Sequence, residues 1–189
     1  MTPDIHIAWF NAHGGAFHKL LRLHSELVRA GASCELVFAS GPPRGLKPGV
    51  DIPEALLPGL EAAGVRLTPR AEALERARNT KARLLVTDAH HDADIPALLA
   101  EVRARGVETA QLATLLGAFT CHGARHLLVQ HPLTLFFELE YNRTRESARL
   151  AAAQRVYFTG NLFFEPTVNE LHGGHADREA FCARYSFNP

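Results

Sequence analysis

The sequence lacks an excess of charge of either sign. Its 189 residues include 20 lysines and arginines against 20 aspartates and glutamates. A balanced chain has no long-range field that would attract nucleic acid or other polyanions, so we expect no nucleic-acid partner. Apolar residues make up 47% of the chain, which argues against disorder. The length is sufficient to bury one substantial core.

Long apolar runs, targeting signals and paired cysteines are also missing. No uninterrupted apolar stretch approaches the roughly 20 residues that a membrane-spanning helix needs. The start of the chain, Met1–Asp4, lacks the basic and then apolar pattern of a signal peptide. Cys34, Cys121 and Cys182 are odd in number and have no paired spacing. That usage fits a reducing compartment, and we expect a cytoplasmic protein.

The common nucleotide-binding motifs do not occur either. The sequence contains no P-loop and no G-x-G-x-x-G, so ATP or NAD binding has no support from a motif. We therefore expect no cofactor. There is also no internal repeat and no low-complexity segment, which favours an ordinary globular domain.

What the sequence does contain is organised around the turn Asn11–His18. An apolar strand pattern over 5–10 leads into this turn, and a helix pattern followed by a second strand over 34–39 leads out of it. The expected apolar face of the helix consists of Phe17, Leu20, Leu21, His24, Leu27 and Val28, with Gly31 as the stop. In parallel sheets, ligands bind at the carboxyl ends of strands, where this turn lies. Gly14 and Gly15 let backbone amides approach a ligand closely.

The remaining chain alternates between strand and helix patterns. Strands are expected over 65–68, 83–88, 109–112, 126–130 and 155–159. Helices are expected over 53–63, over 71–81 and over 133–154, and the helix over 71–81 is polar and so belongs to an outer layer. A further helix is expected after Asp94, with Gly106 as its stop. Its apolar face consists of Ile95, Leu98, Leu99 and Val102. This alternation predicts an α/β fold with a Rossmann-like doubly wound parallel sheet.

Two histidines of the turn, His13 and His18, are candidates for a general base. A helix N-terminus disfavours the charged form of histidine, so such a residue tends to be neutral and able to accept a proton. Asp88 ends the strand over 83–88. A hydrogen bond from the histidine to Asp88 would orient the base and stabilise the imidazolium, as in a catalytic triad without its nucleophile. The alternative is that His18 caps its helix or packs under the turn.

A dense cluster follows Asp88 in the pattern Asp88-x-His90-His91-Asp92-x-Asp94. Carboxylates and imidazoles at this density favour a divalent metal as an alternative interpretation, with further ligands available from His122, His126 or His131. The competing explanation is that Asp92 or Asp94 caps the next helix. Under the metal reading, the protein would be a metal-dependent hydrolase.

Two other segments carry weaker signals. Cys121-His122 lacks any activating context, so an idle cysteine is the better interpretation. The apolar segment Leu133–Phe137 precedes three arginines, Arg143, Arg145 and Arg149. That pattern is compatible with peripheral contact to an anionic membrane, although such a pattern is more often a core-facing turn that leads to a solvated face.

Taken in order, these motifs resemble the N-terminal half of the GT-B glycosyltransferases, which include the UDP-sugar transferases and the N-acetylglucosaminyltransferase of peptidoglycan synthesis. The resemblance is carried by the opening segment 4–39 with its glycine turn and its Leu-Val-Arg-Ala-Gly helix end, the strand that ends in Asp88, the Thr-Gly-Asn strand end at 159–161, and the segment 177–189 with its Arg-Glu, Phe, Arg-Tyr and Pro. As an ordered set, these motifs span nearly the whole chain.

The resemblance implies an enzyme that transfers a sugar from a nucleotide-sugar donor to a hydroxyl acceptor, which is a small molecule, a lipid or a glycan. It places the base on His18 and its partner on Asp88. The spacing departs from the family pattern, because Ala16 and Phe17 separate the glycines from His18, so His13 remains an alternative base. Substrate-binding candidates are Gly14, Gly15, His90 and Asn161.

The resemblance also bears on domain organisation. We expect one Rossmann-like acceptor-side domain over 1–165 and a linker over 166–189, with the donor-binding second domain absent from this sequence, so that this half would not turn over by itself. Hydrolysing UDP-N-acetylglucosamine 2-epimerases share the same architecture, so the fold alone does not fix the reaction. A non-catalytic binding domain is the remaining alternative.

Overall fold

The computed structural model describes residues 2–10, 14–40, 65–88, 92–113, 123–129 and 155–159, and for residues 14–19, 40 and 66 it describes the backbone alone. The expected helices over 53–63 and 133–154 lie outside the described residues, as do the turn residues 11–13 and the segment 160–189. The statements that follow concern the described part of the chain.

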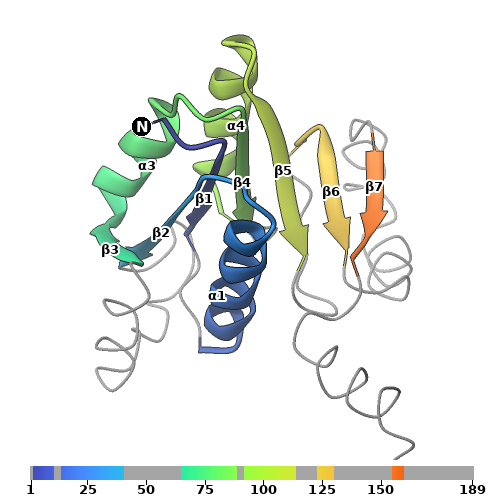
Figure 1. Cartoon of the computed structure of the whole chain (residues 1–189). Coiled ribbons are helices and arrows are strands. Elements are labelled where there is room, and N and C mark those ends of the chain that lie inside the picture. Colours follow the sequence, from blue (N-terminus) through green and yellow to red (C-terminus); the bar gives the residue numbers. More distant parts are fainter. Residues whose placement is uncertain are drawn as a thin grey trace, which may run out of the picture.

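The described residues form one sheet of seven strands in the order β3-β2-β1-β4-β5-β6-β7 (Figure 1). The strands are β1 (Ile5–Trp9), β2 (Cys34–Ser40), β3 (Arg66–Pro69), β4 (Leu84–Asp88), β5 (Glu108–Ala113), β6 (His126–Val129) and β7 (Arg155–Phe158). Every neighbouring pair is parallel. This is the strand order of the Rossmann-type doubly wound fold, extended by one strand. The expected α/β fold class is confirmed.

Three helices cover the two faces of this sheet. They are α1 (Gly14–Arg29), α3 (Arg70–Arg78) and α4 (Ile95–Ala104). α1 packs on one face, over Ile7 and Trp9 of β1 among others, and the apolar side of α1 contributes Leu20. α3 and α4 pack on the other face, over Ala8 and Phe10. The alternation of neighbouring β1 residues between the two core layers follows from the two-residue period of a strand.

The helix predictions are confirmed in α4 and corrected in parts of α1 and α3. The four residues expected on one face of α4 are all buried, namely Ile95, Leu98, Leu99 and Val102. In α1, Val28 is 50% exposed, because it lies about 100° around the helix from Leu27 and so falls at the margin of the apolar stripe. α3 ends at Arg78 rather than at position 81, and it buries Ala73 and Ala77 despite its polar composition.

The predicted helix stops are confirmed. Gly31 and Gly106 follow α1 and α4 with φ angles of 87° and 85°. An L-residue with a side chain reaches this left-handed region only at a cost, whereas glycine adopts it freely. Both helices therefore end where the sequence places a glycine, and the chain turns back into the next strand.

One connection in the sheet reverses the direction in which the chain adds strands, and it places β4 beside β1. β1 pairs with β2 on one side and with β4 on the other. The chain runs outward from β1 through β2 to β3, then crosses back to β4 and runs outward through β5. The carboxyl ends of β1 and β4 are therefore the topological switch point, where open parallel sheets bind their ligands.

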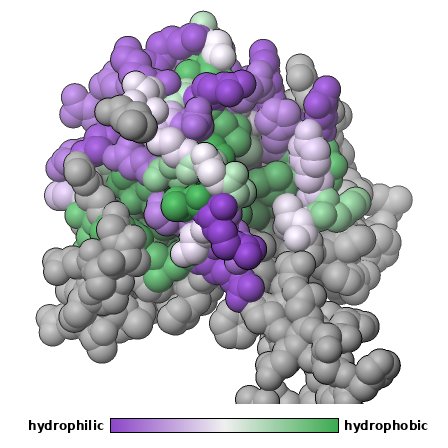
Figure 2. Space-filling model, in the orientation of Figure 1, coloured by the Kyte–Doolittle hydropathy of each residue, from purple (hydrophilic) through white to green (hydrophobic). Residues whose placement is uncertain are grey.

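In the same orientation, Figure 2 shows hydrophilic residues along the upper rim and hydrophobic residues gathered on the face of the sheet around α1. Among the described helices, none is long and apolar enough to cross a membrane.

Candidate functional site

Asp88 is the last residue of β4 and lies at the switch point. Ala8 of β1 is in register with Thr87, so Trp9 runs alongside Asp88. Asp88 is two positions after Val86 and is in register with Leu112, and both of these belong to the core layer under α1. By strand alternation, the carboxyl group of Asp88 lies on the α1 face of the sheet. The residue that was expected to partner the base is thus at the ligand-binding edge of the fold.

The carboxyl group of Asp88 is buried and lacks compensation. Its exposed fraction is 0%, and neither Oδ1 nor Oδ2 has a hydrogen-bond partner among the described residues. Burial raises the pKa of Asp88 to about 8, and the negative charge of Asp92 adds to the shift, while the backbone amides of Asp88 and Phe10 and the charge of Arg70 oppose it. An uncompensated ionisable group with a pKa near neutrality is a signature of functional sites.

The backbone around Asp88 is held firmly. Nε2 of Gln111 donates a hydrogen bond of 3.2 Å to the carbonyl oxygen of Asp88. Gln111 lies on the adjacent strand β5 and is fully buried. The position of Asp88 is therefore fixed through its main chain, whereas its side chain is left for a partner from elsewhere.

The other predicted site residues are placed only in part. α1 begins at Gly14, so Gly14 and Gly15 are its first residues instead of forming a turn before it, and position 18 is in its second turn. Because α1 follows β1 directly, its amino end lies at the same edge as Asp88, and the amides of its first turn have no partners within the helix. His13, His90 and Asn161 lie outside the described residues, and the side chain of His18 is likewise not described.

Arg70 joins three segments at this edge of the sheet. It is the first residue of α3, and its Nη2 donates to both carboxylate oxygens of Asp92, at 2.7 and 2.6 Å, and to Oδ2 of Asp94 at 3.1 Å. Its Nη1 donates to the carbonyl oxygen of Phe10 at 3.4 Å, and its Cζ is 5.5 Å from the centroid of the Phe10 ring. The guanidinium thus connects the ends of β3 and β1 with the segment before α4.

This ion pair changes the interpretation of the acidic cluster. Asp92 and Asp94 are engaged by a guanidinium, so their charge is already compensated by protein and is less available to a divalent cation. Within the described part of the chain, no group of three or more His, Cys, Asp or Glu residues is placed to hold a metal ion. These contacts provide no support for the alternative of a metal-dependent hydrolase.

The cap of α4 differs from the prediction that the side chain of Asp92 or Asp94 would cap this helix. Asp94 occupies the N-cap position of α4, but its side chain makes no capping hydrogen bond. Oδ1 of Asp92 instead accepts a hydrogen bond of 3.0 Å from the backbone N–H of Asp94. Both carboxylates also accept hydrogen bonds from the guanidinium of Arg70.

Sequence reasoning missed Arg70 and Gln111. Arg70 stands between a short strand and a polar helix pattern, where it reads as an ordinary surface residue. The signal that would have identified it is its position, because it directly follows a strand of a parallel sheet and so lies at the ligand-binding edge. Gln111 is a polar residue within a strand that is apolar on both sides, and such a residue needs a partner when it is buried.

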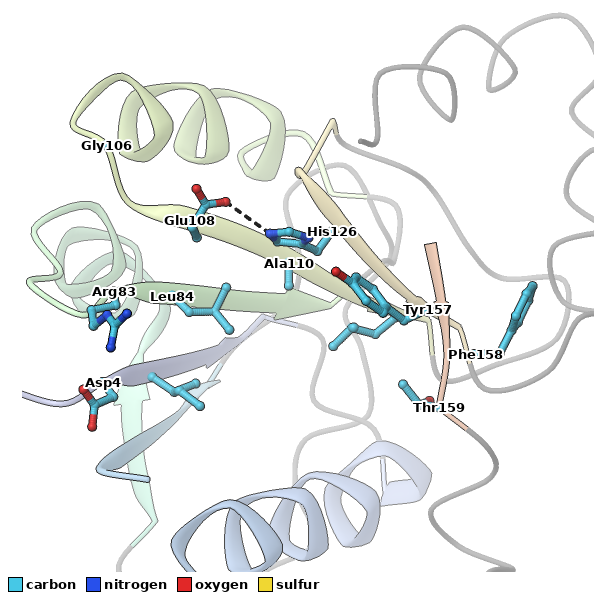
Figure 3. Close-up of a pocket in the computed structure, with 12 residues that line it drawn as sticks. Asp4, Arg83, Leu84, Gly106, Glu108, Ala110, His126, Tyr157, Phe158 and Thr159 are labelled. Atoms are coloured by element: carbon cyan, nitrogen blue, oxygen red, sulfur yellow. Dashed lines mark hydrogen bonds and ion pairs between the residues drawn. The ribbon is translucent and has the colours of Figure 1, made fainter. Parts of the chain in front are cut away.

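A separate cavity of about 960 Å³ lies on the α1 face of the sheet, toward the amino ends of β1, β4 and β5 (Figure 3). Nε2 of His126 is 3.1 Å from Oε2 of Glu108 at its wall, and the ring of Tyr157 lies 5.8 Å from that of His126. Glu108 also pairs with Arg125. Asp88 is not among the residues that line this cavity, so the cavity is distinct from the Asp88 edge.

Comparison with known proteins finds few similarities. No family model and no curated protein matches the chain. A solved structure of a UDP-glucosyltransferase from Polygonum tinctorium capable of glucosylating indoxyl, in complex with 3,4-dichloroaniline, resembles the chain with a TM-score of 0.47 and 11% sequence identity. The match covers 86% of this chain and 53% of that one. The assignment of the fold rests on the strand order itself.

Proposed function

We propose that this chain forms the acceptor-binding part of a glycosyltransferase that uses a nucleotide-sugar donor. The observation that carries the proposal is the buried, uncompensated carboxyl of Asp88 at the switch point, beside the amino end of α1. The resemblance of the ordered sequence motifs to the GT-B enzymes supports it, because in several of these enzymes a histidine near the start of the first helix is the base and an aspartate at this strand end is its partner. In this sequence His13 precedes α1, and His18 lies within its second turn.

In the proposed reaction, a histidine of the Asn11–His18 turn removes the proton from the acceptor hydroxyl. The hydroxyl oxygen then forms a bond to the anomeric carbon of the sugar, and the bond from that carbon to the nucleotide diphosphate breaks. Asp88 accepts a hydrogen bond from the second ring nitrogen of the histidine and stabilises the imidazolium. His18 is our preferred base, and His13 is the alternative.

The electrostatics of Asp88 suit this role. A pKa of about 8 belongs to the carboxyl without a partner. A cationic imidazolium beside it would favour the carboxylate, and the two groups would then titrate as a coupled pair. A buried aspartate whose oxygens have no hydrogen-bond partner among the described residues is therefore suited to a histidine that becomes charged during the reaction.

The proposal is tested by incubating the chain and the full product of its gene with UDP-glucose or UDP-N-acetylglucosamine and a panel of alcohol and phenol acceptors. Release of UDP that depends on the acceptor, with a product heavier by one sugar, is the expected result for the full gene product. Asp88→Asn should abolish most of this release, and Glu101→Gln, an acid-to-amide change on the exposed side of α4, should not. Release of UDP without a glycosylated product would instead identify a hydrolase or epimerase.

A further inference from the structure

The cavity on the α1 face of the sheet has the size and the apolar floor of a ligand site. Its volume of about 960 Å³ lies near the upper end of the range for small-molecule pockets, roughly 300–1,000 Å³. Apolar side chains of four neighbouring strands form the floor and belong to the core layer under α1, namely Ile5, Leu84, Ala110 and Leu128. A core layer that lines open space in this way is suited to an apolar ligand.

One wall of the cavity adds an unused hydrogen-bond acceptor. Glu108 forms an ion pair with Arg125, so its side chain is a carboxylate and only accepts hydrogen bonds. Nε2 of His126, which is 3.1 Å from Oε2 of Glu108, therefore donates. In a neutral imidazole the other nitrogen, Nδ1, is then an acceptor. Nδ1 is buried and has no hydrogen-bond partner among the described residues.

Tyr157 stands beside this acceptor. Its ring centroid is 5.8 Å from that of His126, and the two rings are tilted by 50°. Figure 3 shows the hydroxyl end of Tyr157 directed toward His126. Tyr157 is 41% exposed and lies on β7, the last strand in the order of the sheet. Because Nδ1 is shielded from solvent, a ligand reaches it when this exposed ring turns aside, and the ring can then pack against the ligand.

The charges around the cavity favour a neutral ligand. Glu108 is already compensated by Arg125. Asp4 and Arg83, which have opposite signs, lie near each other at the end of the cavity away from His126 (Figure 3). A charged ligand would lose its hydration without meeting a surplus of opposite charge. A neutral molecule with one donor group meets the apolar floor and the acceptor without that cost.

We propose that this cavity binds a neutral, planar aromatic molecule that carries a hydroxyl group. The ring system lies on the apolar floor, where the small side chain of Ala110 leaves room, and it packs against the ring of Tyr157. The hydroxyl group donates a hydrogen bond to Nδ1 of His126. The inference is independent of the proposed function, because neither Asp88 nor the Asn11–His18 turn takes part.

The experiment compares three probes that differ in one property each, by calorimetric titration of the full chain at neutral pH. They are 2-naphthol, 2-methylnaphthalene, in which a methyl group replaces the hydroxyl, and decahydro-2-naphthol, which keeps the hydroxyl but is not planar. We expect 2-naphthol to bind about tenfold more tightly than 2-methylnaphthalene and at least about threefold more tightly than decahydro-2-naphthol. Apolar burial alone predicts the opposite order for the first pair, since the methyl compound is the more hydrophobic.

Variants locate the binding. His126→Phe keeps a ring but removes the acceptor, so it should weaken 2-naphthol about tenfold and abolish its advantage over 2-methylnaphthalene. His24→Phe is the matched control. His24 lies on α1, its Nε2 is 3.2 Å from the carbonyl oxygen of Cys34, and it does not line the cavity. Asp88→Asn is the second control, because phenols are also acceptors under the proposed function. Both controls should bind 2-naphthol as the wild type does.

The ¹⁵N signals of the His126 ring in the wild type keep the inference testable if His126→Phe does not fold. Addition of 2-naphthol should shift the signal of Nδ1, and 2-methylnaphthalene should leave it unchanged. An affinity for 2-naphthol no greater than that for either other probe would overturn the inference, as would an Nδ1 signal that does not respond. Loss of binding in Asp88→Asn but not in His126→Phe would also overturn it, while leaving the proposed function intact.

Discussion

Gln111 donates a hydrogen bond from its side chain to the backbone carbonyl of Asp88, and both residues are fully buried. The bond crosses from β5 to the carboxyl end of β4, so the main chain of Asp88 is anchored while its carboxylate has no partner among the described residues. A site in which an acid must bind a second group in one orientation needs the backbone of that acid to be fixed, as the backbone of Asp88 is here.

Asp88→Asn should make the protein more stable at neutral and alkaline pH. The pKa of Asp88 is raised from 3.8 to about 8 by burial and by Asp92. Between those two values the folded state holds a proton that the unfolded state has lost, so the stability that Asp88 contributes is present below pH 3.8 and is lost as the pH rises through 8. The advantage of Asn should grow by up to about 1.4 kcal/mol per pH unit in this window. Urea unfolding at several pH values measures it, and a constant difference would contradict the assignment.

The two turn histidines are compared in the full gene product under the transfer assay. His18→Ala should lower kcat by about 10²–10⁴-fold, the usual contribution of a general base, with folding preserved. His13→Ala should have a smaller effect. Near-normal turnover in His18→Ala together with loss in His13→Ala would transfer the role to His13. Normal turnover in both variants would reject a histidine base.

Leu20→Ala and Val28→Ala form a matched pair within α1. Leu20 is fully buried against the sheet, and Val28 is 50% exposed. We expect Leu20→Ala to lower the free energy of unfolding by about 2–5 kcal/mol, because it removes apolar contacts and leaves a cavity. Val28→Ala should change it by less than about 0.5 kcal/mol, since an exposed site loses little and alanine has the better helix propensity. Chemical denaturation of both variants checks the orientation of α1.

His6→Gln should reduce the acid sensitivity of the fold. Burial lowers the pKa of His6 from 6.5, with Glu35 opposing the shift and Arg76 adding to it. The unfolded chain therefore binds a proton near pH 6.5 that the folded chain does not, and stability is present above that pH and lost as the pH falls. Nδ1 of His6 lies 3.1 Å from Oγ1 of Thr80. Thermal unfolding of both proteins between pH 5 and 8 should show a flatter profile for the variant.

Much of the fold was predictable because it depends on local patterns. Strands near Ile5, Cys34, Leu84 and Val156 were expected as parallel members of one sheet, and this is confirmed. The buried face of α4 and the glycine stops follow from helix periodicity and from the freedom of glycine at positive φ. The strand segments, the helix face and the glycine stops each depend on residues that are close together in the chain, and the alternation of strands and helices implies the parallel sheet.

The interactions of the site were less predictable because they join distant segments. The pair of Arg70 and Asp92 exists only once the order β3-β2-β1-β4 brings positions 70 and 92 to the same edge. The acidic run at 88–94 was consistent with a metal site or a helix cap when the arginine was not considered. The position of Asp88 at the carboxyl end of a strand was predictable because the strand is apolar almost throughout and ends in a carboxylate.

The pairing of β1 with β4 has a consequence for how the protein reaches its folded state. Residue 5 is in register with residue 84, so this pairing closes a loop of the chain that includes β2, β3 and α3. Closing such a long loop is entropically costly and slows folding of sheets with non-local pairings. The first βαβ unit can form early from local contacts, but the edge that carries Asp88 is assembled only by the later long-range step. We therefore expect the edge that carries Asp88 to form in the same cooperative step as the whole sheet, and not before it.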